Sequence, residues 1–167
     1  MGEIGAWSPE HKPGVLSRLL EIWRESQLYD VQRQAAWAIM ALPIIDRELK
    51  PLPEPDPDMV DFIKQQYSLM GGKEDIKDSA EFKRSAALVI GFYWKTPWTD
   101  EELAQLVASE YDRRNKYDIL DRQNFVPLLK ALGEPGMAQL EALEQKEGSR
   151  SRGIKASSKK RAKKSQK

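Results

Sequence analysis

The sequence predicts an all-α protein, and three observations support this prediction. Apolar residues recur at helical spacing, in stripes of i, i+3, i+4 and i+7, along most of the first 147 residues. Prolines and glycines divide these stripes into segments of ordinary helix length. The chain has no Asn-Gly or Asp-Gly pair and no sustained alternation of apolar and polar residues, which are the signals of hairpins and strands. We therefore expect seven helices and no sheet.

The first two helices are expected on either side of a short break at residues 26–29. The first begins at Pro13, because proline is favoured in the first helical turn. The second has Asp30 as its N-cap and ends before Pro43, since an aspartate side chain can accept the first backbone N–H groups. The apolar residues of the two stripes are Val15, Leu16, Leu19, Leu20 and Trp23, then Val31, Ala35, Ala38, Ile39 and Leu42.

A proline-rich connector separates the second helix from the third. Residues 51–57 contain four prolines, which exclude a helix and favour an extended, polyproline-like conformation. The third helix is expected over residues 59–70, with the glycine pair at Gly71 as its C-cap. A polar loop is expected over 73–78. The fourth helix, over 82–93, is apolar around much of its circumference, so we expect it to be the most buried.

The last three helices have clear start or stop signals. Residues 99–102 form a Thr-x-x-Glu capping box that opens the fifth helix. The sixth is expected from about residue 118 to residue 132, with Gly133 as its C-cap. The seventh, which is shorter, is expected between residues 135 and 147.

Two of the expected helices carry the same sequence pattern, 51 positions apart. Residues 29–39 and 80–90 share the order acidic, apolar, polar, Arg, polar, Ala-Ala and further apolar residues, which makes Arg33 and Arg84 equivalent. Without the seven connector residues the period is 44, within the roughly 40–47 residues of HEAT and armadillo units. The alanine pairs would allow a neighbouring helix to approach closely, and each Arg could reach an acidic group of an adjacent repeat. A weaker echo without the alanine pair begins at Tyr117.

This pattern resembles the inner helix of a HEAT repeat, in which an Asp, an apolar residue, an Arg and an alanine pair follow one another. Residues 125–135, with a proline ahead of a leucine-rich turn, look like the outer helix of such a repeat. The resemblance covers most of residues 13–147 and is cleanest over 13–42. It implies an α-α superhelix of HEAT or armadillo type with about three helix pairs. The inner helices of such a solenoid line a concave surface.

The charge of the chain is divided sharply between a body and a tail. The net charge is +1, but residues 148–167 hold nine basic and no acidic residues, which leaves −8 on the preceding part. With one apolar aliphatic residue and no aromatic, the tail is expected to be disordered. We thus expect an N-terminal segment (1–12), a HEAT-like domain (13–147) and a disordered Lys/Arg/Ser-rich tail. The basic residues expected to attract nucleic acid or an acidic protein are Lys159, Lys160, Arg161, Lys163 and Lys164.

Candidate partner-binding residues lie on the two pattern-bearing helices. Aromatic and arginine side chains dominate binding hot spots, and on a solenoid the inner helices would present them to a protein partner. The alternative for the same side chains is packing between repeats. The candidates are Arg33, Trp37, Arg84, Tyr93 and Trp94.

Catalytic and metal-binding classes have little support in the sequence. The chain has no cysteine and a single histidine, His11, which excludes disulfides, thiol catalysis and a His-rich metal site. The acidic residues Asp56, Asp58 and Asp61 lack the order of a calcium loop, so we interpret them as helix-start carboxylates. No phosphate-binding loop, dinucleotide fingerprint or hydrolase motif is present. We expect no catalytic residues, no metal and no cofactor.

The expected function is a non-enzymatic scaffold or adaptor of HEAT-repeat type with an electrostatic tail. One alternative is a nucleic-acid-associated protein that binds phosphates through the tail. Another is a HEAT-like enzyme of DNA glycosylase or bilin lyase type, similar in repeat type only. With no apolar run long enough to span a membrane and no secretory signal, a cytoplasmic location is expected. A nuclear location is expected if the protein comes from a eukaryote, because the basic tail resembles a nuclear-import signal. Three repeats are close to the lower limit for an array, so capping by the segment around Trp7, or self-association, is also expected.

Overall fold

A computed structural model describes residues 12–41, 52–69, 75–114 and 119–148, and all regular secondary structure in these ranges is helical. The predicted all-α class and the predicted number of helices are confirmed for this part of the chain. The helices are α2 (Lys12–Glu25), α3 (Tyr29–Ala41), α4 (Pro57–Ser68), α5 (Asp75–Trp94), α6 (Asp100–Arg114), α7 (Ile119–Ala131) and one over residues 134–148.

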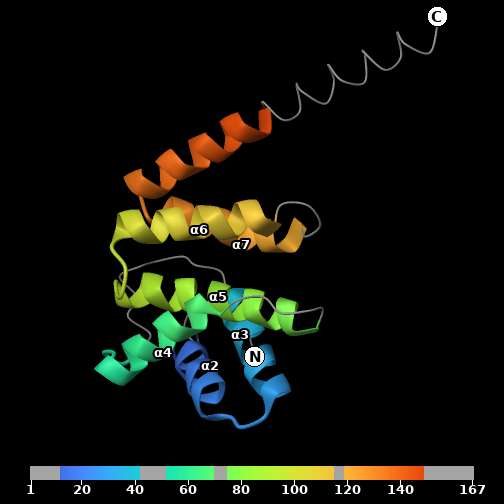
Figure 1. The fold of residues 1–167 in the computed structure, drawn as a ribbon. Helices are drawn as coiled ribbons and strands as arrows, with labels where there is room; N and C mark the ends of the chain where they lie inside the picture. The colour runs from blue at the N-terminus through green and yellow to red at the C-terminus, as the bar shows by residue number, and fades with distance from the viewer. Residues whose placement is uncertain (1–11, 42–51, 70–74, 115–118, 149–167) are drawn as a thin grey trace, which may run out of the picture.

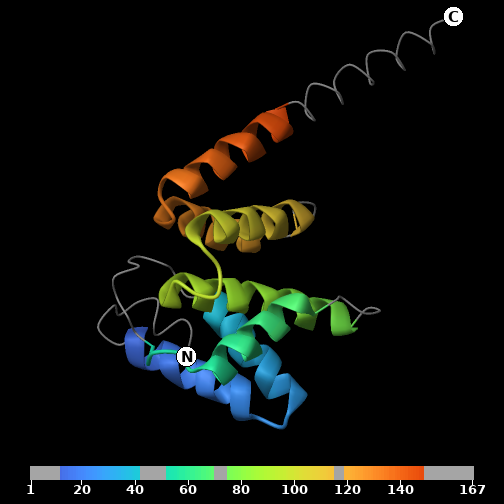
Figure 2. The same cartoon turned by 60° about the vertical axis from the view of Figure 1, so that its left-hand side comes forward.

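The helices pack in sequential pairs, and the pairs are layered along the molecule (Figures 1 and 2). Helix α2 packs on α3, α4 on α5 and α6 on α7. Helix α5 also contacts α3 on one side and α6 on the other, so it joins the three layers. The helix of residues 134–148 lies beyond the α6–α7 layer, at the opposite end from α2 and α3 (Figure 1). No described helix is long and apolar enough to cross a lipid bilayer.

Helix α5 is the most buried of these helices, as its composition predicts. Every residue from Lys83 to Tyr93 is buried, which requires neighbours on all sides of the helix. The alanine pairs of the repeated pattern are also buried, with no residue of either pair more than 4% exposed. Small side chains at buried positions are consistent with close packing of α3 and α5 on their neighbours.

Two residues at equivalent positions of the repeated sequence pattern contact each other. The Lys83 Nζ donates a hydrogen bond of 3.2 Å to the Gln32 Oε1, and these two residues are 51 positions apart, which is the offset of the repeat. In a stack of like units, matching residues of neighbouring units lie side by side. The same Nζ lies 5.3 Å from the centroid of the Tyr29 ring. Helices α3 and α5, which carry the repeated sequence pattern, are therefore neighbours in the fold.

Burial lowers the pKa of Lys83 below its usual value. The unfolded chain then holds this proton up to a higher pH than the folded chain does, so folding stability must rise with pH between the two pKa values. In Lys83→Met this contribution is absent, whereas the lost hydrogen bond to Gln32 is a pH-independent cost. We expect the unfolding free energy of the wild type, minus that of Lys83→Met, to increase between pH 7 and pH 10 in urea titrations. A constant difference over that range would contradict the assignment.

The predicted helix-terminus signals are mostly confirmed. The Thr99 backbone N–H donates to Glu102 Oε2 at 2.9 Å, and the Glu102 N–H donates to Thr99 Oγ1 at 3.2 Å, which is a complete capping box. Gly133 has a φ of 70°, the left-handed conformation of a C-cap glycine. Asp56 caps α4 by accepting the Met59 N–H at 2.8 Å, so this carboxylate is a helix-start residue.

Two helix starts differ from the prediction. Asp30 lies in the first turn of α3 and is not its N-cap, because the helix already begins at Tyr29. Helix α5 begins at Asp75, so most of the predicted loop over 73–78 is helical. No proline or glycine follows Asp75 in that segment, and nothing in its backbone opposes a helix.

The end of α4 also differs, for a tertiary reason. The helix ends at Ser68, and Leu69 is its C-cap in an extended conformation, ahead of the predicted glycine cap. The Leu69 carbonyl accepts a hydrogen bond of 2.7 Å from the Arg84 Nη1. The proline connector is confirmed over residues 52–56, which form neither helix nor strand, but Pro57 is the first residue of α4.

Candidate functional site

A stripe of three residues on α3 is the best candidate for a functional surface. Tyr29, Arg33 and Trp37 are spaced i, i+4 and i+8, which places them along one side of the helix. Tyr29 is 47% exposed and Trp37 is 43% exposed, although α3 buries its opposite side against α2 and α5. We call these three residues the α3 stripe.

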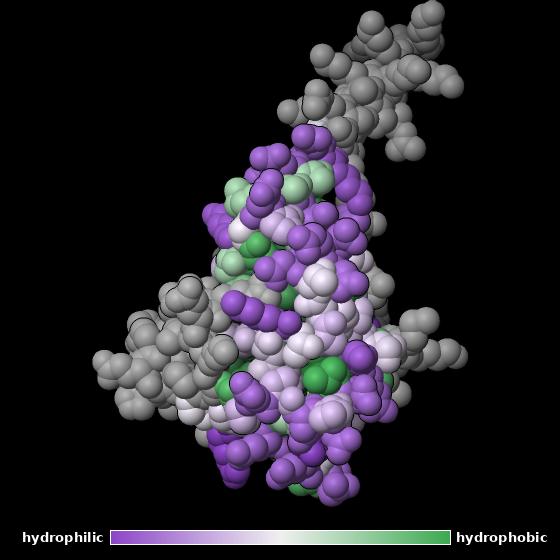
Figure 3. Space-filling model, turned by 90° about the vertical axis from the view of Figure 1, so that its left-hand side faces the viewer, coloured by the Kyte–Doolittle hydropathy of each residue, from purple (hydrophilic) through white to green (hydrophobic). Residues whose placement is uncertain are grey.

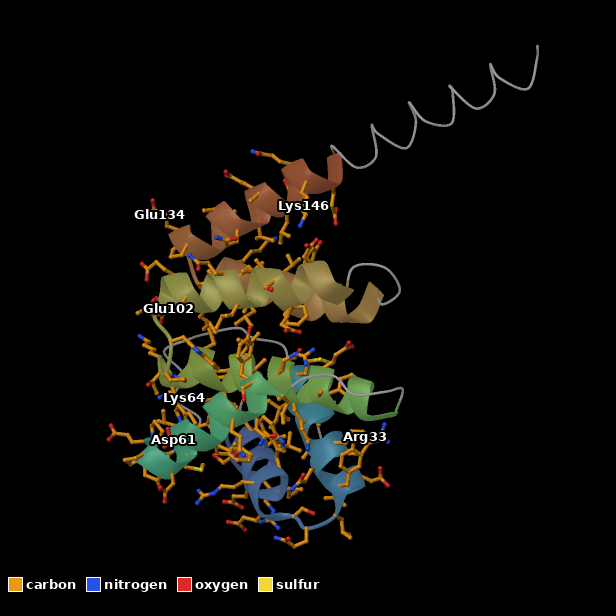
Figure 4. The ribbon with its side chains drawn as sticks, in the orientation of Figure 1. Arg33, Asp61, Lys64, Glu102, Glu134 and Lys146 are labelled. Atoms are coloured by element: carbon orange, nitrogen blue, oxygen red, sulfur yellow. The ribbon has the colours of Figure 1, made fainter. Side chains whose placement is uncertain are left out.

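The central residue of the α3 stripe has an unused hydrogen-bonding group. The Arg33 Nε lies 3.8 Å from the Asp30 Oδ1, one turn earlier in the helix. Within the described ranges this nitrogen has no hydrogen-bond acceptor, although its own surface is buried. Figure 4 shows Arg33 on the opposite side of the molecule from Asp61 and Lys64 of α4. The Arg33 side chain as a whole is 36% exposed, so the part of the guanidinium other than the buried Nε is open to a carboxylate from outside the described fold.

Two of the five predicted partner-binding residues are not on the surface. Arg84 is 7% exposed at its side chain, and its Nε donates a hydrogen bond of 3.0 Å to the fully buried Glu110 of α6. Tyr93 is buried beside Phe92, with ring centroids 5.5 Å apart. Both side chains are buried inside the fold, so they cannot belong to a partner-binding surface. The alternative from the sequence, an Arg that reaches an acidic group of an adjacent repeat, describes Arg84 correctly.

The fifth predicted residue, Trp94, holds the connector. Its indole N–H donates a hydrogen bond of 3.0 Å to the Pro53 carbonyl, and the side chain is half-buried. Leu52, next to Pro53, is buried in the same core. Trp94 therefore fastens the connector to the C-terminal end of α5, while Arg33 and Trp37 remain together on α3.

Tyr29 belongs to the candidate surface but was not predicted from the sequence. The sequence places it in the break between two helices, where its direction is undefined. Its spacing of four and eight residues from Arg33 and Trp37 is the signal that would have identified it, once α3 is known to begin at Tyr29.

The face that contains the turn between α5 and α6 offers less for binding. In Figure 3 hydrophilic residues predominate over the coloured part of this face, and the hydrophobic residues on it are separated from one another. Glu102 and Glu134 lie on this side, at the starts of their helices (Figure 4), where carboxylates are ordinary dipole partners. No group of three His, Asp or Glu side chains in the described ranges is arranged to hold a metal ion.

Several predicted features lie outside the described residues. They include His11 and the segment around Trp7, the first two residues (117–118) of the third repeat echo, and the basic residues Lys159, Lys160, Arg161, Lys163 and Lys164. Their roles stay predictions from the sequence.

Comparison with known proteins gives no family and no relative. The chain matches no family model, no curated protein and no solved structure. The functional argument therefore depends on the geometry of this chain alone.

Proposed function

We propose that this protein is a non-enzymatic scaffold or adaptor of α-solenoid, HEAT-like type that binds a protein partner through the α3 stripe. The observation that carries the proposal is the exposure of Tyr29 and Trp37 on either side of Arg33, on a helix that also has five buried residues. Layered helix pairs, buried alanine pairs and the contact between the matching residues Gln32 and Lys83 support the solenoid class.

The residue types of the stripe favour a protein partner. Trp, Tyr and Arg are the side chains most enriched at interface hot spots, because each buries a large area and keeps a hydrogen-bonding group. An exposed Trp gains most when a partner removes it from water, about 25 cal/mol for each Å² of apolar surface. Trp37 is therefore the residue on which partner affinity should depend most.

Replacement of Trp37 by alanine is expected to weaken partner binding at least about tenfold, the usual loss at a hot spot. The partner would first be captured with the full chain and identified, and its affinity then measured by calorimetry with the purified pair. Met137→Ala is a matched control, because Met137 is 44% exposed but lies on the helix of residues 134–148. Equal affinities of the Trp37→Ala variant and the wild type would reject the α3 stripe as the binding surface.

The basic tail supports a second candidate function, binding to nucleic acid. Nine basic residues without an acidic one would release counterions from phosphates, with a strong dependence on salt. Deletion of residues 149–167 separates the two functions in binding assays at two salt concentrations. The scaffold function predicts that partner binding survives this deletion, whereas the nucleic-acid function predicts that binding and its salt dependence are both lost.

A further inference from the structure

The repeat allows the α3 stripe to be compared with the same stripe one unit later. On α5 the three equivalent positions are all buried, with exposed fractions of 6% or less. The equivalents of Tyr29, Arg33 and Trp37 are, in that order, Ala80, Arg84 and Leu88. One stripe is thus covered and its counterpart is exposed.

Helix α6 packs on α5 and contacts this side of it at Arg84. Arg84 donates to Glu110 near the end of α6, and Gly91 lies against the Trp98 side chain just before α6 begins. These two contacts, at opposite ends of the pair, show that α6 runs antiparallel to α5. Leu88 lies between Arg84 and Gly91 on the same helix face. The residues of α6 that are buried in the core are Leu103, Ala104, Val107, Ala108 and Tyr111.

Chain connectivity explains why α3 lacks such a cover. Only residues 95–99 separate α5 from α6, so α6 folds back directly onto α5. The connection from α3 to α4 spans residues 42–56, and α4 packs on α5. The proline insertion therefore takes the next helix away from α3 and leaves its stripe exposed.

We propose that the α3 stripe is the docking site for an amphipathic α-helix of a partner protein, which packs on α3 as α6 packs on α5 and offers a carboxylate to Arg33. This inference rests on the proposed function and specifies the chemistry of the partner. The two equivalent arginines differ in exposure, because the Arg33 side chain is 36% exposed whereas the Arg84 side chain is 7% exposed. The Arg84 Nε donates to Glu110 at 3.0 Å, whereas the Arg33 Nε has no acceptor within the described ranges.

The shape of the stripe adds a requirement on the partner. Tyr29 and Trp37 stand where α5 has the smaller Ala80 and Leu88. A helix with the side chains of α6 should therefore lie further from α3 than α6 lies from α5, and the Arg33 side chain is long enough to keep its contact with a carboxylate. The partner helix should carry a glutamate or aspartate at the position of Glu110.

The experiment uses a synthetic, fluorescently labelled peptide of residues 99–114, which is α6 with its capping box, added to the full-length protein. Fluorescence anisotropy should show saturable binding. Arg33→Gln in the protein, or Glu110→Gln in the peptide, should each weaken binding about tenfold, because either change removes a charged hydrogen bond. The two changes together should weaken it little further, since they remove the same contact. Trp37→Ala should also weaken binding, and Met137→Ala should not.

Three results with the peptide, and a fourth by sedimentation, would overturn the inference. Those with the peptide are absence of saturable binding, additive effects of Arg33→Gln and Glu110→Gln, and binding that appears only after residues 1–11 are removed, which would assign the stripe to that segment. A concentration-dependent dimer that Trp37→Ala dissolves, seen by sedimentation, would assign it to a second copy. If the peptide fails while the purified partner still requires Trp37, the helical mode is rejected and the scaffold function stands. If partner binding is also indifferent to Trp37, both are rejected.

Discussion

Replacement of Arg84 by methionine is expected to lower the free energy of unfolding by about 3–5 kcal/mol, the cost of leaving a buried charge without its partner. Glu110 is fully buried, and its carboxylate is paired with the Arg84 Nε at 3.0 Å. Arg84 also donates to the Leu69 carbonyl, so the substitution loosens the end of α4 as well as the contact between α5 and α6. Urea denaturation followed by circular dichroism at pH 7 measures the loss.

The repeat supplies a matched control, Arg33→Met. Arg33 holds the same position in the earlier unit, but its side chain is 36% exposed and its carboxylate neighbour is 3.8 Å away. An exposed pair of this kind contributes about 0–1 kcal/mol. The double variant Arg84→Met/Glu110→Leu should recover most of the stability, because it removes both buried charges. A loss in Arg84→Met no larger than in Arg33→Met would show that the buried pair does not stabilise the layers.

Local sequence signals predict the helices well but their ends less well. The apolar stripes locate all the helices of the described ranges, and the capping box at Thr99 and the left-handed Gly133 are seen as predicted. The end of α4 depends on a hydrogen bond between Leu69 and Arg84, which are 15 residues apart, and no local signal reports it. Where a backbone carbonyl at a helix end accepts a hydrogen bond from another element, the position of that end depends on tertiary structure.

The candidate site was predictable in residue type but not in exposure. Arg33 and Arg84 occupy the same place in the same pattern, yet one has an unused Nε and the other is buried. The difference arises from the length of the chain that follows each helix, because a short turn returns α6 to α5 whereas a long connector takes α4 away from α3. The sequence pattern is the same on both helices, so it cannot distinguish the exposed arginine from the buried one. The lengths of the two connections do distinguish them, but only when it is known which helices pack together.

The contact between α7 and the helix of residues 134–148 depends on a single glycine. A Cβ at Gly136 would lie 1.8 Å from the Leu129 carbonyl oxygen and 2.7 Å from its carbon. Both atoms belong to the backbone, so no side-chain rotation can relieve the overlap. Leu143, which is buried in the core, lies further along the same helix and would lose its place if the helix moved.

Gly136→Ala is therefore expected to destabilise this end of the stack by about 3 kcal/mol, the upper part of the usual cost of overpacking. The 134–148 helix should detach from α7, which would expose Leu143 and raise amide hydrogen exchange in both helices, while α2 and α3 at the opposite end of the stack keep their protection. Gly14→Ala is the control, since a Cβ there meets nothing within 4 Å and Ala in a helix stabilises by about 0.4–1 kcal/mol. Similar effects of the two substitutions on stability would mean that the close approach at Gly136 does not hold the helix to α7. If Gly136→Ala lowers the free energy of unfolding and Gly14→Ala raises it, with faster exchange confined to α7 and residues 134–148, the absence of a side chain at Gly136 is what allows the last helix to pack on α7.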